Sequence, residues 1–581
     1  TYVGQILQIF LFTAAILVAL LVLYFRRLYG ILLPLVGILL SSVWGLGIIS
    51  LLGFNLDPLT LVIPFLISAR AMSHGVQLVQ RYYQELTIVK QARIAARNTF
   101  DSLFRPGTLG VTSDAIGLLL IALSSVPINV KLAYYASLWA FGVIFTVLVF
   151  IPLALTILPQ PRQYRPSSSR RGGRFQGLVN AIWNPSGSRA VLGATALLLL
   201  GGAYLSSWVQ IGEAEPGTPL LYPEHDYNVS SKAINTLFPG SEELYVIART
   251  DEKGGIKRPE VLRALQSLQV HMLNDPELGG AKGVPDLVKQ VNRILHNDDP
   301  RWMQIPDESS YVGGLLFSYM ASSPVPGALK EFIDTDEQEA NLVFYYKDHK
   351  GETIRRAIHM VKEWVAQHGS KIEGLSIHLA GGSIGVMAAI NEASYSTNML
   401  IIPLVLGLIF IFVTLFYWSW HAGWLMLLAM SFSTLLTYAY MGLSGVGINV
   451  NTVPIIAVGI GVGIDYSIYI MDRIREEMSR AAAVVPAVRK AIRTTGVAIG
   501  FTAASLISGV IMWVFLSDLR FQSDAALLLC VMLTLNALAA IFIVPAWIML
   551  FRPSFITRVR FDADGILVNT GQDDPGRRGP Y

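Results

Sequence analysis

The chain has 581 residues, of which 53% are hydrophobic and 14% charged, with a formal net charge of +4 and a mean hydropathy of +0.51. Ordinary soluble domains carry about 25% charged residues, so this composition excludes a soluble enzyme, a coiled coil or a disordered chain for the molecule as a whole. The small, scattered positive charge gives no support for binding to nucleic acid. Cys530 is the only cysteine, so the chain can form neither an internal disulfide bond nor a cysteine-based metal site.

Apolar stretches of about 20 residues, long enough to cross a bilayer as a helix, recur along the whole chain. They predict eleven membrane spans, at residues 4–25, 30–52, 57–80, 107–126, 132–158, 190–209, 397–417, 422–443, 451–472, 495–516 and 523–550. Loops rich in lysine and arginine alternate with loops that hold almost none. The positive-inside rule places the basic loops in the cytoplasm, so we expect the N-terminus outside and the C-terminus inside.

One long insertion, residues 210–395, separates the sixth and seventh predicted spans and is expected on the outer side. Its residue patterns predict strands at 244–249, 341–346 and 375–379, helices at 258–274, 284–295 and 352–368, and loops in the proline-rich stretch 300–326. The chain therefore divides into a first membrane bundle (1–158), a basic cytoplasmic linker (159–189), one span (190–209), an α/β domain (210–395), a second bundle (396–552) and a cytoplasmic tail (553–581).

The first five predicted spans resemble the last five. The matching segments are Arg81-Tyr82-Tyr83-Gln84-Glu85 with Arg473-Ile474-Arg475-Glu476-Glu477, Gly110-Val111-Thr112 with Gly500-Phe501-Thr502, and Phe150-Ile151-Pro152 with Ile543-Val544-Pro545. Two parallel repeats related by a pseudo-twofold axis along the membrane normal are typical of transporters. The sixth span and its insertion have no counterpart in the first half, so we expect a further span and a second outer domain to precede Thr1.

One motif in the second repeat resembles a known family. The segment Gly459-Ile460-Gly461-Val462-Gly463-Ile464-Asp465-Tyr466, which closes with Asp472-Arg473-Ile474-Arg475-Glu476-Glu477, is similar to the fourth-span motif of the resistance–nodulation–division (RND) superfamily, in its hydrophobe- and lipid-exporting MMPL branch. The resemblance implies a polytopic α-helical membrane protein with a pseudo-twofold repeated bundle and a porter-like, ferredoxin-like βαβ periplasmic domain. At the equivalent place in the first repeat, the sequence departs from the motif and reads Ser68-Ala69-Arg70-Ala71-Met72-Ser73-His74.

Asp465 is an acidic residue inside a predicted span. It lies seven residues before Asp472, which places it about 10 Å from the cytoplasmic end of the helix. An ionisable side chain near the middle of a membrane costs about 2.5–3.5 kcal/mol on insertion scales and is functional by default. We therefore expect Asp465, with its neighbour Tyr466, to belong to a proton relay. Gly459, Gly461 and Gly463 should let neighbouring helices approach this segment closely.

The first repeat has its own intramembrane polar residues. Arg70 and His74 lie on one face of the third predicted span, and Asp114 lies in the fourth. The cheapest arrangement pairs Arg70 with Asp114 in the centre of the bundle, with His74 nearby. Two interpretations stay open: the three residues complete a proton relay with Asp465, or the pair is a static structural contact and His74 a satisfied core hydrogen-bonding group.

Sequence motifs for nucleotide binding, metal binding and hydrolysis are absent or weak. There is no phosphate-binding P-loop, and the histidine spacings give weak support to a zinc site, so we expect no metal and no cofactor. The segment Gly381-Gly382-Ser383-Ile384-Gly385 matches the G-x-S-x-G pattern of serine hydrolases, but the following helix runs directly into a span. We interpret Gly381, Gly382 and Gly385 as a hinge.

The sequence and the resemblance together predict a multi-pass protein of the bacterial inner membrane with a large periplasmic domain. We expect proton-motive-force-driven export or trafficking of hydrophobic or lipid-like substrates, by proton antiport and without enzymatic activity. The expected partners are the substrate, membrane lipids, other copies in a homo-oligomer (dimer or trimer) and a periplasmic accessory protein, with no nucleic acid. The alternatives are a lipid- or sterol-sensing scaffold without proton coupling, a membrane lipid hydrolase that depends on Ser383, and a component of a protein-secretion motor.

Overall fold

The computed structural model describes residues 2–55, 62–161, 173–368, 372–480, 483–557, 559–561 and 567–569. Two compact units are present. The helical unit comprises Thr1–Val209, Ser394–Val446 and Val450–Tyr581, and the α/β unit comprises Gln210–Ala393 and Gly447–Asn449. Residues 162–172 of the predicted linker 159–189 and most of the predicted tail 553–581 lie outside the described residues.

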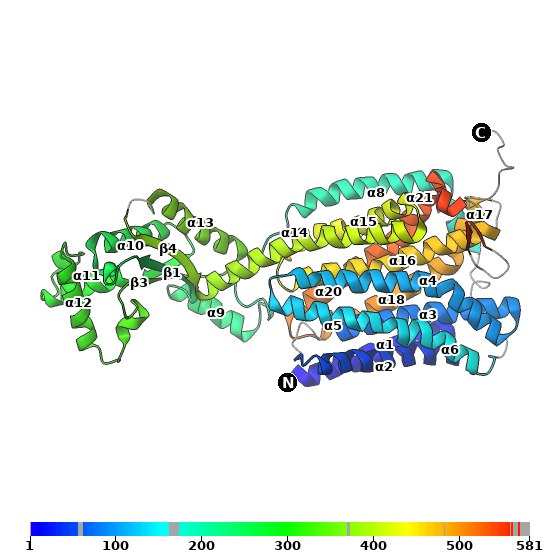
Figure 1. Cartoon of the computed structure of the whole chain (residues 1–581), viewed down its shortest axis with the longest axis horizontal. Coiled ribbons are helices and arrows are strands. Elements are labelled where there is room, and N and C mark those ends of the chain that lie inside the picture. The colour runs from blue at the N-terminus through cyan, green and yellow to red at the C-terminus, as the bar shows by residue number, and fades with distance from the viewer. Residues whose placement is uncertain are drawn as a thin grey trace. The chain divides into compact units, whose positions relative to one another are not determined.

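The helical unit is built from long apolar helices (Figure 1). Its main helices are α1 (Tyr2–Phe25), α2 (Leu28–Leu51), α3 (Val62–Val89), α4 (Ala92–Leu119), α5 (Pro127–Val143), α6 (Phe150–Ile157), α7 (Gly173–Ile182), α8 (Pro185–Ser206), α14 (Gly382–Tyr417), α15 (Trp420–Ser444), α16 (Thr452–Arg480), α17 (Val484–Ala491), α18 (Val497–Val510), α19 (Met512–Leu516), α20 (Arg520–Leu538), α21 (Val544–Phe551) and α22 (Ser554–Thr557). A short hairpin, β5 (Val559–Phe561) and β6 (Leu567–Asn569), follows them.

Ten helices within the described residues are long and apolar enough to cross a membrane, so the chain is a multi-pass membrane protein. Ten of the predicted spans coincide with them. The predicted span 57–80 largely coincides with α3, a 28-residue helix that is not among these ten and whose preceding residues lie outside the described part.

Helix contacts in the two repeats follow one pattern. Helix α4 of the first repeat packs against α16 of the second, and its counterpart α18 packs in the same way against α3. Within the first repeat α2 packs against α5, and within the second the counterparts α15 and α20 pack against each other. Both repeats also contain a π-helical segment, Ile144–Val149 and Ala539–Ile543, shortly before Pro152 and Pro545. A proline lacks the N–H that would continue the helix ladder, and a wider turn accommodates its ring. The predicted pseudo-twofold bundle is confirmed.

Among the ten candidate spans of the described residues, α16 is the most enclosed helix. All of its most apolar window is buried, against 22% for α1. It packs against α4, α15 and α20, which lie alongside it in Figure 1. Polar groups on α16 are therefore held away from lipid by other helices of the chain.

The α/β unit contains a four-stranded antiparallel sheet in the order β2-β3-β1-β4. The strands are β1 (Glu242–Thr250), β2 (Leu278–Lys282), β3 (Glu339–Tyr346) and β4 (Leu375–Gly381). The helices are α9 (Asp226–Leu237), α10 (Pro259–Met272), α11 (Val284–Leu295), α12 (Ser309–Ser322) and α13 (Gly351–His368). Helix α10 connects β1 to β2 and α13 connects β3 to β4, which is the predicted ferredoxin-like arrangement.

Three elements of this unit differ from the prediction. Strand β2 is not predicted from the sequence, because its residues Leu-Gly-Gly-Ala-Lys have low strand propensity. It lies at the edge of the sheet. Helix α9 exposes most of its apolar residues and so lacks the usual periodicity. The expectation of loops throughout 300–326 is wrong, because α12 lies between the prolines, which flank the helix and do not interrupt it.

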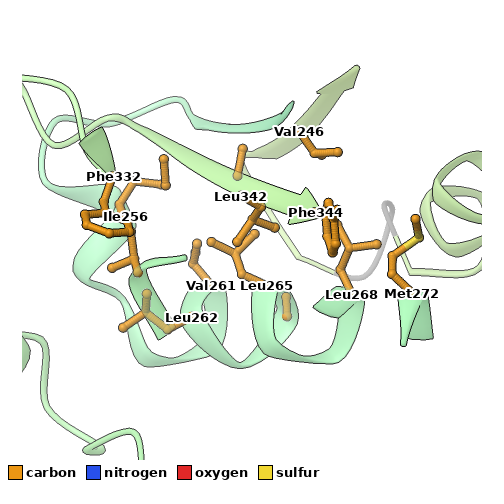
Figure 2. Packing of buried hydrophobic residues seen from close by; sticks show 14 of the residues in the cluster. Val246, Ile256, Val261, Leu262, Leu265, Leu268, Met272, Phe332, Leu342 and Phe344 are labelled. Carbon is orange, nitrogen blue, oxygen red and sulfur yellow. The ribbon is translucent and has the colours of Figure 1, made fainter. Parts of the chain in front are cut away.

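The core of the α/β unit lies between the sheet and α10 (Figure 2). Leu262, Leu265 and Leu268 recur at three-residue intervals along the buried face of α10, and Leu342 and Phe344 come from β3. Full burial of each such side chain contributes about 1.5–3 kcal/mol, so this layer holds the sheet in place.

A largely buried pair of a histidine and a glutamate joins the start of β1 to the loop that follows β3. His349 is 8% exposed, and its Nδ1 lies 3.1 Å from Glu242 Oε1. The hydrogen bond from His349 lowers the pKa of Glu242. Burial alone would lower the pKa of His349, but the hydrogen bond and the charge of Glu242 raise it above its usual value.

We predict that this pair stabilises the α/β unit only between two pH limits. The contribution of His349 is present below its unfolded pKa of about 6.5 and is lost as the pH rises through its raised folded pKa. The contribution of Glu242 is present above its unfolded pKa of about 4.3 and is lost as the pH falls through its lowered folded pKa. The variant His349→Gln should lower the local opening free energy by about 1–3 kcal/mol between these limits.

Hydrogen exchange of β1 and α13 in the native protein measures this effect at mildly acidic and at alkaline pH. His359→Gln is the matched control, because the His359 side chain on α13 is 78% exposed. Equal protection in the His349→Gln variant and the native protein at mildly acidic pH would contradict the prediction.

Candidate functional site

Three charged side chains from three helices meet inside the helical unit. Arg70 from α3, Asp114 from α4 and Asp465 from α16 are 1%, 3% and 4% exposed. The guanidinium of Arg70 forms an ion pair with Asp114 Oδ2, and its Nη2 lies 2.9 Å from Asp465 Oδ2. The same Nη2 also donates to the carbonyl oxygen of Gly110 at 3.3 Å. Arg70 thus links both acidic residues, and the predicted Arg70–Asp114 pair is present.

His74 and Tyr469 extend this cluster. His74 lies one turn after Arg70 on α3, and its Nε2 is 3.4 Å from Asp465 Oδ2. Its Nδ1 is 2.8 Å from the hydroxyl of Tyr469, one turn after Asp465 on α16. A continuous set of polar groups therefore runs from Asp114 through Arg70, Asp465 and His74 to Tyr469. We call these five residues the charge cluster.

The family motif pointed to Tyr466, but the structure brings Tyr469 to the histidine instead. Tyr466 is 1% exposed, and its hydroxyl has no hydrogen-bond partner among the described residues. The helical spacing of Asp465 and Tyr469 was a usable signal, since residues four apart lie on the same face of a helix.

The three glycines of the α16 motif face three different neighbours. A Cβ at Gly461 would overlap Asp114 Oδ1, so this glycine admits the carboxylate of Asp114. Gly463 faces Asn536, and Gly459 faces Met532. Asn536 also donates to the carbonyl oxygen of Gly459 at 2.8 Å, which fixes α20 against α16. At all three positions the missing side chain leaves room for a side chain of a neighbouring helix.

Helices α3 and α16 run parallel through the charge cluster. Arg70 contacts Asp465, His74 contacts Tyr469, and farther along Arg81 contacts Glu476 at 2.8 and 2.7 Å. Each pair is separated by 395 residues in the sequence, and a constant difference requires parallel helices. Parallel packing of counterpart helices is what an axis along the membrane normal produces.

The charges of the cluster do not balance. Asp114 and Asp465 supply two negative charges and Arg70 supplies one positive charge. A narrow pocket beside Arg70 and Asp114 is lined by apolar side chains and is too small for water. Its lining also includes Ile63, Ile67, Leu118, Ala136, Val458 and Val462. In such surroundings an uncompensated charge is costly, so one added proton, on a carboxyl group or on His74, would make the cluster neutral.

The glycines expected to form a hinge lie in the α/β unit. Gly381 ends β4, and Gly382 begins α14 with a φ of +78°, a conformation that favours glycine. The hydroxyl of Ser383 accepts a hydrogen bond from the backbone N–H of Glu243 at 2.9 Å. Ser383 also forms a hydrogen bond with the side chain of Glu242, whose other partner is His349. Among the described residues, no hydrogen bond joins Ser383 directly to a histidine. Among the described residues, no group of three or more His, Cys, Asp or Glu side chains could hold a metal ion.

We predict that Arg70→Gln lowers the free energy of unfolding by about 3–5 kcal/mol, because two buried carboxylates lose their common partner. The triple variant Arg70→Gln/Asp114→Asn/Asp465→Asn should recover most of this loss, since it removes the uncompensated charges. Thermal unfolding in detergent measures both effects.

The control for this prediction is Arg97→Gln, because the Arg97 side chain is 78% exposed and lies 3.7 Å from Asp101. This variant should change stability by less than about 0.5 kcal/mol. If the triple variant were no more stable than Arg70→Gln, the decrease in the free energy of unfolding would not come from uncompensated buried charge.

The fold is similar to that of a solved structure. SecDF, a translocon-associated membrane protein from Thermus thermophilus, superposes with a TM-score of 0.55 at 18% sequence identity. The alignment covers 95% of this chain and 62% of SecDF, so the chain spans less than two thirds of that protein. At this identity the similarity establishes the fold. No curated protein matches the sequence.

The sequence itself matches a family over more than half of its length. The model of the MMPL family covers residues 226–560, which include most of the α/β unit, α14 and the whole second repeat with Asp465. The chain also has the repeated bundle and the antiparallel sheet of the RND fold that SecDF shares. The protein is therefore a member of the MMPL family, and its fold is that of the RND superfamily.

Proposed function

We propose that the chain couples proton movement through the charge cluster to the transport of a hydrophobic or lipid-like substrate. Membership in the MMPL family supports the class of substrate. The charge imbalance supports proton coupling, and it is the observation on which the proposal depends: one guanidinium serves two buried carboxylates, with a histidine in contact.

The mechanism follows from where the partners lie in the two repeats. Arg70 and His74 belong to the first repeat and Asp465 to the second, so their contacts join the two halves of the bundle. When Asp465 is charged, it attracts Arg70 and lies against His74. When a proton neutralises Asp465, Arg70 keeps only Asp114, and the link between α3 and α16 weakens. The proton thereby biases a two-state equilibrium between a closed and a looser pairing of the repeats.

The energy available is sufficient for such a bias. One elementary charge that crosses the membrane potential releases about 2.3 kcal/mol per 100 mV. Since 1.4 kcal/mol is a tenfold change in an equilibrium constant, one proton can change the population ratio by more than tenfold.

The α/β unit has a separate role in this proposal. It would lie in the periplasm, receive the substrate from the inner membrane or its outer leaflet, and pass it on for export. The hinge at Gly381, Gly382 and Gly385 would transmit motion to it through α14. Assembly into a dimer or trimer and a periplasmic accessory protein belong to the same proposal.

A second candidate function is a lipid- or sterol-sensing scaffold without proton coupling. It is favoured by the contacts of Arg70 with both carboxylates, because a guanidinium held on two sides can be purely structural. Such a scaffold would bind lipid equally well at every pH and would not depend on the charge of Asp465.

We predict that Asp465→Asn abolishes proton-coupled transport in the native protein while leaving it folded, because the amide keeps the shape of the side chain but cannot exchange a proton. The assay uses proteoliposomes with a pH-sensitive dye inside and a fluorescent phospholipid analogue as the probe. Asp101→Asn, whose side chain is 45% exposed on α4, is the control and should behave as the native protein. Proton-driven movement of the analogue at the native rate in Asp465→Asn would refute the coupling.

His74→Gln tests the second half of the relay. The glutamine retains a hydrogen bond but cannot carry the proton, so we predict a loss of proton flux of at least about tenfold, consistent with the effect of a proton-transfer group. His421→Gln is the control, because His421 is an exposed residue near the start of α15. An unchanged proton flux in His74→Gln would exclude His74 from the relay and leave Asp465 alone.

A further inference from the structure

Gly110 on α4 lies directly against the carboxylate of Asp465. A Cβ at this position would overlap Asp465 Oδ1, so no side chain larger than hydrogen fits while Asp465 keeps its place. The carbonyl oxygen of Gly110 also accepts the hydrogen bond from Arg70 Nη2 at 3.3 Å. Gly110 therefore contacts both members of the ion pair that joins the two repeats.

The two oxygens of Asp465 have different surroundings. Oδ2 lies 2.9 Å from Arg70 Nη2 and 3.4 Å from His74 Nε2. Oδ1 is buried and has no hydrogen-bond partner among the described residues. It is this unpartnered oxygen that lies against Gly110. The missing side chain thus sets the rotation of the carboxylate, because only a glycine lets Oδ1 approach α4 while Oδ2 reaches Arg70 and His74.

The repeat provides an internal comparison. Gly500 on α18 is the counterpart of Gly110, within the matching segments Gly-Val-Thr and Gly-Phe-Thr. A Cβ at Gly500 would meet no atom within 4 Å. Close helix packing therefore does not require a glycine at the second position. The steric demand at Gly110 comes from the carboxylate that lies against it.

We propose that Gly110 is a positioning residue that holds the Asp465 carboxylate between Arg70 and His74 and leaves Oδ1 as the oxygen that accepts the proton. This inference rests on the proposed proton coupling and names the residue that orients its acidic group. A methyl group at position 110 displaces the carboxylate from α4, and the contacts of Oδ2 with Arg70 and His74 change with it.

The test compares Gly110→Ala with Gly500→Ala in the native protein, reconstituted in lipid. Infrared difference spectra recorded over a pH titration follow the carbonyl stretch of protonated Asp465, assigned by its loss in Asp465→Asn. The groups that can influence this titration are Arg70 and His74 on α3, Asp114 on α4, and Tyr466 and Tyr469 on α16. We expect Gly110→Ala to shift the band and its titration midpoint and to reduce proton flux at least about tenfold, the size expected for a misplaced proton-transfer group. Gly500→Ala should leave the band, the midpoint and the flux unchanged.

A double variant covers the case in which Gly110→Ala does not fold. If the clash is with the carboxylate, then Gly110→Ala/Asp465→Ala removes it, and the double variant should fold with at least the stability of Asp465→Ala. A double variant that is less stable than Asp465→Ala, or that does not fold, would overturn the inference, because Gly110 would then serve helix packing.

The two proposals fail in different ways. If Asp465→Asn abolishes proton flux but Gly110→Ala leaves the band, the midpoint and the flux unchanged, the positioning role of Gly110 is wrong and the proton coupling stands. If Asp465→Asn retains full flux, the proposed function is wrong. A displaced Asp465 band in Gly110→Ala would then still establish the contact as structural, without a role in coupling.

Discussion

Two buried carboxylates that share one guanidinium inside an apolar helix bundle impose a constraint on the rest of this protein. Arg70 must reach Asp114 on α4 and Asp465 on α16 at once, so three helices have to converge at one depth. Convergence requires small residues at the crossing, which is where Gly110 and Gly461 lie. It also requires that other helices enclose α16, as they do along its most apolar window. The buried charge and the close-packed bundle therefore depend on each other.

The two repeats share a fold but not a chemistry. Helix pairs and proline-associated π-helical segments correspond in both halves. The acidic residue of the family motif, however, occurs only in the second half, and the first half contributes Arg70 and His74 instead. Asp114 likewise stands where the second repeat has Ala504. A pseudo-symmetric scaffold thus carries an asymmetric site, in which the first half supplies Arg70, His74 and Asp114 and the second half supplies Asp465.

Much of the architecture could be predicted from the sequence, because apolar length and repeat pattern are strong signals. The paired bundles and three of the four main strands follow directly from them. Strand β2 could not be predicted, since its two glycines give no strand signal and only pairing with β3 forms it. Helix α12 could not be predicted either, because the prolines on both sides of it indicate loops although none lies within the helix. In the site, the cost of unpaired charges inside the membrane predicted the Arg70–Asp114 pair. The bridge from Arg70 to Asp465 and the contact of Gly110 depend on how separate helices dock.

The constant separation between partners on α3 and α16 limits how the two halves can move. Three contacts, at Arg70, His74 and Arg81, share the same offset along two parallel helices. A slide of one helix by a single turn, about 5.4 Å, would break all three together and bring no acidic group opposite Arg70. A tilt about one end would release them in order, beginning with the contact farthest from the pivot. Rocking is therefore the cheaper displacement for this interface, and shear along the helix axes is the costly one.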